Sequence, residues 1–107
     1  MQLVTSVYRQ TSLLPSDERY GLTSQMRRAS VSVPSNIAEG YCRDSVRDYL
    51  RLLTIAQGSL AELETQIEVA ERLEYWSPSD ARQLLDEAQS VARLLQALRN
   101  SLVSLAQ

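Results

Sequence analysis

The feature that most constrains the fold is a regular apolar repeat within residues 45–75. Apolar residues recur there at alternating spacings of three and four, as in a helix that buries one seam. Ser45 stands just before the repeat and is placed as the N-cap residue of this helix. Asp48 is an acidic residue at the third helical position, as in a capping box. The sequence therefore predicts a long helix over residues 45–75 that packs on other helices. The seam comprises Val46, Tyr49, Leu53, Ala56, Leu60, Leu63, Ile67 and Ala70.

Three further segments show helical periodicity. Residues 2–14 carry their apolar side chains on one side, residues 22–39 repeat them at spacings of four, three and four, and residues 78–105 alternate four and three. Ser77 is placed as the N-cap of the last segment, with a proline at its first position. Three Gly and three Pro leave little room for a turn-rich β fold.

Four amphipathic helices with short connections predict a single all-α domain over residues 1–107, an antiparallel up-and-down four-helix bundle. The alternative is a long two-stranded coiled coil. Pro15, Gly40 and Pro78 interrupt the chain too often for that alternative.

Residues 30–41, SVSVPSNIAEGY, are ambiguous between strand and helix. Their Ser-Val alternation is typical of a strand, but the helical spacing from Leu22 to Val33 is longer, so we predict a helix. Pro34 then lies inside this helix, where it removes one hydrogen bond and is expected to kink the axis. We interpret Gly40 as the residue just past the helix end, where a left-handed conformation favours glycine.

Composition excludes several classes of function. The chain has no His and one Cys, Cys42, so a single chain cannot form a His-based catalytic pair, a His-ligated metal site or an intrachain disulfide. One cysteine fits a cytoplasmic protein. No apolar run follows basic residues near the N-terminus, so we expect no signal peptide, and no stretch approaches the roughly 20 apolar residues of a membrane span. We expect no cofactor, no metal and no enzymatic activity.

The 45–75 helix carries more apolar surface than its seam requires. A second set of apolar residues falls at the c and g positions of the same heptad register. Either the seam is unusually wide, or this set forms an exposed face for oligomer contacts; we favour the second because exposed apolar patches mark association. The set comprises Leu52, Ile55, Val69, Leu73 and Trp76.

Polar residues at the core edge predict a layer between the second and third helices. Asn36 shares a turn with Ile37 after Val33, and a buried amide there needs hydrogen-bond partners. We favour a structural role for this layer over a ligand site. The predicted layer comprises Arg28, Asn36, Glu39, Ser59, Glu62 and Gln66.

Arginines near the junction of these two helices are candidate contacts for nucleic acid. They are Arg27, Arg43, Arg47 and Arg51. The net charge of −2 does not favour phosphate binding by the whole chain, although a local basic patch is compatible with it. For the adjacent Arg27 and Arg28, we favour an ion pair with a glutamate of the 45–75 helix, and a phosphate contact is the alternative.

Three motifs resemble a known family: QMRRA at 25–29, PSNIAEG at 34–40 and GSLAELETQ at 58–66. With the rest of residues 2–105, they resemble the bacterial four-helix bundle proteins encoded in intervening sequences of 23S ribosomal RNA. The resemblance implies a four-helix bundle, commonly a homopentamer, with no known enzymatic activity. Related proteins, the accessory variability determinants of diversity-generating retroelements, bind nucleic acid and a reverse transcriptase through a basic surface, whereas this chain is acidic.

We therefore expect a non-enzymatic cytoplasmic protein that assembles, as a homopentamer by resemblance, and presents a composite surface to a partner. The alternative is an RNA-binding accessory protein that associates with a ribosome or a reverse transcriptase.

Overall fold

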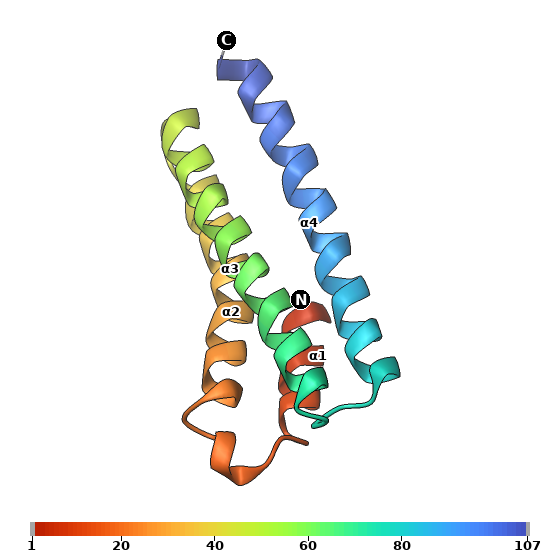
Figure 1. Ribbon diagram of the computed structural model, residues 1–107. Helices are drawn as coiled ribbons and strands as arrows, with labels where there is room; N and C mark the ends of the chain where they lie inside the picture. The colour runs from red at the N-terminus through yellow and green to blue at the C-terminus, as the bar shows by residue number, and fades with distance from the viewer. Residues whose placement is uncertain (1, 107) are drawn as a thin grey trace.

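The computed structural model describes residues 2–106, which form four α-helices and one short 3-10 helix (Figure 1). The all-α class is confirmed, because the described residues form helices and turns and no strand. Positions 1 and 107 of the predicted domain lie outside the described residues. The elements in chain order are α1 (Gln2–Thr11), η1 (Ser16–Glu18), α2 (Leu22–Tyr41), α3 (Val46–Arg72) and α4 (Pro78–Ala106).

The helices pack as an elongated body with extents of 47 × 24 × 18 Å. Helix α3 contacts α2 on one side and α4 on the other, while α1 contacts α2 and α4 (Figure 1). In Figure 1 the chain turns back between α2 and α3, and again between α3 and α4. Because α1 has 10 residues and α4 has 29, α1 lies along only part of the length of the other helices.

The predicted seam of α3 forms the centre of the core. Leu53, Leu63 and Ile67 of this seam are fully buried. Burial of a side chain of this size contributes about 1.5–3 kcal/mol relative to exposure. The seam meets buried residues of all three other helices, among them Val7, Met26, Val33, Leu84 and Leu95.

Local signals set the helix starts, and the end of α3 falls earlier than predicted. The N–H of Asp48 donates to Ser45 Oγ at 3.0 Å and that of Asp80 donates to Ser77 Oγ at 3.1 Å, so both N-caps are confirmed. Helix α3 ends at Arg72, because Glu74 takes a left-handed conformation with φ of 62°. The N–H groups of Glu74 and Tyr75 fold back on the helix: Glu74 donates to the Glu71 carbonyl at 2.9 Å and Tyr75 to the Ala70 carbonyl at 3.0 Å.

Gly40 has a different role from the one predicted. Helix α2 continues to Tyr41, and none of the described glycines has a positive φ, so the left-handed cap at Gly40 is wrong. A Cβ at Gly40 would lie 2.6 Å from Tyr49 Cδ1 and 3.4 Å from Leu52 Cβ. Glycine therefore allows α2 and α3 to approach closely here. Pro34 lies inside α2 as predicted, and the kink of the axis stays a prediction.

Three side chains tie the α3–α4 connection to the first part of the chain. Trp76 Nε1 donates to the carbonyl oxygen of Gln10 at 3.1 Å. Tyr75 Oη donates to Glu18 Oε2 at 2.9 Å, while Glu18 Oε1 accepts the N–H of Leu22 at 3.2 Å. The hydrogen bond to Glu18 is the main reason why the pKa of Tyr75 lies above its usual 10.0. Within residues 2–106, no helix combines the length and apolar character required to cross a membrane.

Candidate functional site

An open groove of about 510 Å³ lies between α2 and α3. We call it the polar groove; it is lined by Gln25, Arg28, Ala29, Ser32, Ser59, Glu62 and Gln66. Four residues of the predicted layer, namely Arg28, Ser59, Glu62 and Gln66, are therefore brought together. Gln25 and Ser32 were missed, although both lie one helical turn from Arg28 or Ala29, and this spacing could have identified them.

Hydrogen bonds at one end of the polar groove join the two helices. The hydroxyl oxygens of Ser32 and Ser59 lie 2.8 Å apart and form a hydrogen bond between α2 and α3. Asn36 Nδ2 donates to the Ser32 carbonyl at 2.8 Å and to Ser32 Oγ at 3.0 Å. Asn36 therefore does not line the groove itself but holds Ser32, which does, by hydrogen bonds.

Farther along the polar groove, Gln66 Oε1 is buried and accepts no hydrogen bond from residues 2–106, as is also the case for Gln10 Oε1 and Glu87 Oε2 elsewhere in the molecule. A buried acceptor without a donor costs about 1–3 kcal/mol. Arg28 and Glu62 are exposed at the same groove and offer a cation and a carboxylate to solvent. The polar groove can therefore take both a donor and an acceptor from a second molecule.

Glu39 does not belong to this group. It forms an exposed ion pair with Arg43, one turn along the chain. The predicted layer is corrected at this position, because the local i,i+4 partner takes the carboxylate.

The predicted apolar face of α3 is only partly exposed. Ile55, Val69 and Leu73 are 42%, 41% and 52% exposed. Leu52 and Trp76 are 3% and 4% exposed, so their predicted place on an exposed face is wrong. Leu52 is buried beside Gly40 of α2, and Trp76 packs in the core while bonded to α1.

The exposed apolar residues and the three α3 residues of the polar groove fall on one helical line, which ends at Leu73, the first residue after α3. We call this line the α3 stripe; it comprises Ile55, Ser59, Glu62, Gln66, Val69 and Leu73, at alternating spacings of four and three. It is apolar at both ends and polar in the middle, and its middle lines the polar groove.

The candidate arginines divide into two groups. Arg27 is used inside the chain: its Nε donates to Thr11 Oγ1 at 2.9 Å, and its guanidinium lies 4.7 Å from the ring centre of Tyr8. It joins α2 to α1, so the expected ion pair with a glutamate of α3 is wrong for this residue. Arg47 and Arg51 are exposed on α3, one helical turn apart.

A further arginine, Arg99 of α4, was missed by the sequence analysis. Its Nη1 donates to Thr54 Oγ1 at 2.6 Å and to the Leu50 carbonyl at 3.5 Å. Leu50 and Thr54 alternate with Arg47 and Arg51 on one side of α3. No signal within α4 could have identified Arg99, since its place depends on the packing of α4 against α3.

Charge is unevenly distributed along the molecule. We call the end where α2 finishes, α3 begins and α4 finishes the basic end (Figure 1). Its charged residues, over positions 36–58 and 90–106, are Arg43, Arg47, Arg51, Arg93 and Arg99 against Glu39, Asp44 and Asp48. Basic residues are in excess at this end, although the whole chain has a net charge of −2.

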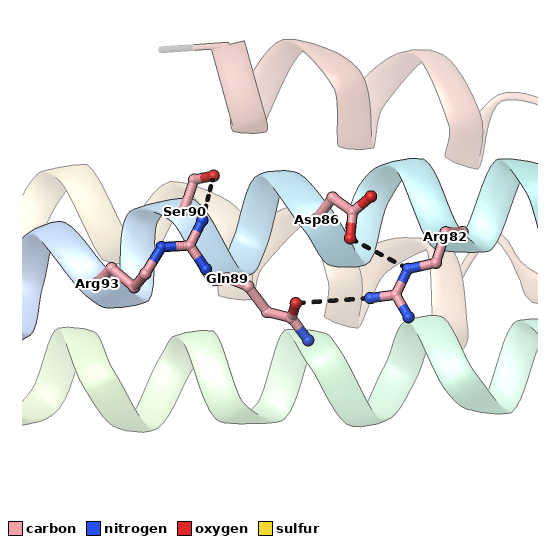
Figure 2. A network of polar contacts seen from close by, with 5 residues as sticks. All are labelled: Arg82, Asp86, Gln89, Ser90 and Arg93. Atoms are coloured by element: carbon pink, nitrogen blue, oxygen red, sulfur yellow. Dashed lines mark hydrogen bonds and ion pairs between the residues drawn. The ribbon is translucent and has the colours of Figure 1, made fainter.

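The polar side chains along α4 bond to one another, as Figure 2 shows. Arg82 donates to Asp86 at 3.1 Å and to Gln89 at 3.5 Å, and Arg93 donates to Ser90 at 3.1 Å. All five side chains are exposed. This row is a solvated surface, in contrast to the polar groove with its buried acceptor.

A family model described as 23S rRNA-intervening sequence protein matches residues 1–97. The chain belongs to this family. The match includes α1, α2 and α3 and therefore every residue of the polar groove and the α3 stripe. A search of curated proteins finds no match. In this member of the 23S rRNA-intervening sequence protein family, no group of three or more Cys, Asp or Glu among residues 2–106 is placed to hold a metal ion.

Proposed function

We propose that this chain is a non-enzymatic assembly protein whose copies associate through the α3 stripe and the polar groove. The observation that carries the proposal is the composition of the stripe. Ile55, Val69 and Leu73 remain about half exposed at its two ends. Between them lies the buried, unpaired acceptor Gln66 Oε1.

Association through this surface is favourable for two physical reasons. Association is favoured by about 25 cal/mol of free energy for each Å² of exposed apolar surface that a second molecule covers. Arg28 and Glu62 are exposed at the polar groove and would in addition offer a donor and an acceptor to a second copy. Helix α4 supports the choice of surface by contrast, because its polar row is already satisfied by its own residues (Figure 2).

The proposed number of copies comes from the family resemblance, which implies a homopentamer. We further propose that the ring presents a repeated surface to a protein or RNA partner and acts in the cytoplasm. The single cysteine Cys42 is free and exposed, which fits a reducing compartment.

Sedimentation velocity tests the assembly proposal. We expect the wild type to have about five times the chain mass of 12.0 kDa. The double variant Val69→Glu, Leu73→Glu should shift to the monomer, since two charges would be desolvated in the contact. Leu94→Glu is the matched control, because Leu94 is 70% exposed on α4 and lies off the stripe.

The double variant and its control separate the outcomes. A wild type that is monomeric at tens of micromolar would overturn assembly as a function. A double variant that keeps the wild-type mass would refute the α3 stripe as the contact while leaving assembly intact.

RNA binding is a second candidate function, favoured by the basic end. Arg47 and Arg51 are exposed there, and among residues 2–106 neither forms an ion pair. A ring would repeat this local charge several times. We expect binding of structured RNA that weakens steeply as salt rises above about 0.1 M. Absence of binding at micromolar protein would eliminate this function.

A further inference from the structure

A pocket of about 280 Å³ lies at the end of the molecule opposite the basic end, where α1 finishes, η1 follows and α2 begins (Figure 1). Its volume is close to the lower limit of roughly 300 Å³ for small-molecule sites. Two guanidinium groups and four hydroxyl groups line it, and no carboxylate of residues 2–106 does. We call it the arginine pocket; its polar lining residues are Thr11, Ser12, Ser16, Arg19, Thr23 and Arg27.

Contacts within the chain hold Arg27 in this pocket. Its Nε donates to Thr11 Oγ1 at 2.9 Å, and Thr11 Oγ1 donates in turn to the Val7 carbonyl at 2.7 Å. Its guanidinium lies over the Tyr8 ring, and its Nη2 donates to the Tyr8 carbonyl at 3.4 Å. These contacts fix the plane of the guanidinium, while Nη1 donates no hydrogen bond within residues 2–106 and is available to a ligand.

Arg19 brings a second cation to the same pocket without a counter-ion. It is exposed, and its side chain forms no hydrogen bond or ion pair within the part of the chain that the structure describes. Of the two acids that precede it, Glu18 accepts hydrogen bonds from Tyr75 Oη and the N–H of Leu22, and Asp17 does not line the pocket. Because two like charges that face one pocket repel each other, an anion between them is stabilised.

We propose that the arginine pocket binds the dianionic phosphate group of a small molecule, held between Arg19 and Arg27. Guanidinium groups bind phosphate oxygens through paired N–H donors. The hydroxyls of Ser16 and Thr23 form no hydrogen bond among residues 2–106 and supply further donors. A carboxylate offers two oxygens to these donors, whereas a terminal phosphate offers three and carries more charge. The pocket shares no lining residue with the polar groove, so this inference does not depend on the proposed assembly.

The experiment titrates the full chain with methyl phosphate and, separately, with dimethyl phosphate. At about pH 7.5 methyl phosphate is mostly a dianion, because the second pKa of a phosphate monoester is about 6. Dimethyl phosphate is a monoanion and represents the diester of a nucleic-acid backbone. Acetate and inorganic phosphate are two further probes. Binding at about 0.1 M salt is followed by the nuclear magnetic resonance shifts of the backbone amides and of the Arg27 Nε–H, which is hydrogen-bonded to Thr11.

We expect methyl phosphate to bind at least about 10-fold more tightly than dimethyl phosphate or acetate, with shifts centred on residues 11–27. Arg19→Gln should weaken methyl phosphate binding by about 10-fold or more and leave the fold intact, since this side chain has no internal contact to lose. Arg9→Gln is the matched control, because it removes the same charge from an exposed position of α1 that does not line the pocket. Inorganic phosphate that binds as tightly as methyl phosphate would identify free phosphate as the ligand, and weaker binding would identify an ester; both results support the site.

Three results would overturn the phosphate site. Equal affinity for methyl and dimethyl phosphate would remove the preference for a dianion. Equal losses in Arg19→Gln and Arg9→Gln would show a general attraction of anions to the chain, and an unshifted Arg27 Nε–H would place any binding elsewhere. The double variant Val69→Glu, Leu73→Glu should bind methyl phosphate like the wild type, so failure of the assembly proposal and failure of the phosphate site are measured separately.

Discussion

Replacement of Gly40 by alanine would place a methyl group where α2 meets Tyr49 of α3. The new Cβ would lie 2.6 Å from Tyr49 Cδ1 and 3.1 Å from Cε1, well inside van der Waals contact. Either the ring or the helices must move, and overpacking of this kind costs about 1–3 kcal/mol. Alanine recovers at most about 1 kcal/mol of helix propensity. We therefore expect Gly40→Ala to lower the free energy of unfolding by up to about 2 kcal/mol.

Gly58 in α3 provides the matched control. No atom outside the local helix lies within 4 Å of the Cβ that alanine would add there. Helix propensity then acts alone, so Gly58→Ala should raise the free energy of unfolding by about 0.8–1.0 kcal/mol. For a domain of this size, that gain corresponds to a rise in Tm of about 4 °C. The same substitution thus has opposite expected signs at two helical positions.

Urea unfolding followed by far-ultraviolet circular dichroism measures both changes. All variants are compared at one protein concentration, because association adds to apparent stability. The midpoint should fall for Gly40→Ala and rise for Gly58→Ala, with unchanged m-values. In a Tyr49→Ala background, Gly40→Ala should become stabilising. If both alanines raise the midpoint equally in the wild-type background, steric contact with Tyr49 is refuted as the reason for glycine at position 40.

Three further substitutions test local features of the fold. Glu74→Gly should raise the free energy of unfolding by about 1 kcal/mol in urea, because glycine adopts the φ of 62° at that position without steric cost. The hydrogen bond to Glu18 raises the pKa of Tyr75 above 10.0, so its contribution to stability is complete below pH 10.0 and is lost as pH rises through the raised pKa. Tyr75→Phe should therefore show a smaller loss of stability above pH 10.0 than the wild type in alkaline unfolding curves, and an equal loss would contradict this assignment. Asn36→Leu removes two hydrogen bonds to Ser32 and should cost about 1–2 kcal/mol in urea and weaken assembly in sedimentation; unchanged stability and mass would count against the layer.

Features that depend on neighbouring residues in the chain could be predicted from the sequence. The α3 seam follows from heptad spacing, and the N-caps Ser45 and Ser77 follow from residue types within one turn. The interpretation of Gly40 failed because glycine serves both left-handed caps and close helix packing. Only the position of Tyr49 on the facing helix distinguishes these two roles.

The exposed apolar residues were predicted only in part, for two separate reasons. Heptad positions give the angle of Leu52 on its own helix, but they do not say which side α2 covers. Trp76 follows the left-handed residue Glu74, after which the chain no longer follows the helix and the heptad count loses its meaning. Partners from distant segments, such as Thr11 for Arg27, depend on where α1 packs and have no local signal.

The α3 stripe shows why residues of opposite character belong to one surface. The sequence predicts a subunit contact for Val69 and Leu73, and a layer between the second and third helices for Ser59 and Gln66. Their shared spacing of three and four places all of them on the same line of α3, and burial shows that this line lies at the edge of the bundle. A contact with apolar ends and a polar centre selects its partner by more than hydrophobicity, because any partner that covers Arg28 and Glu62 without complementary groups leaves buried charges unpaired.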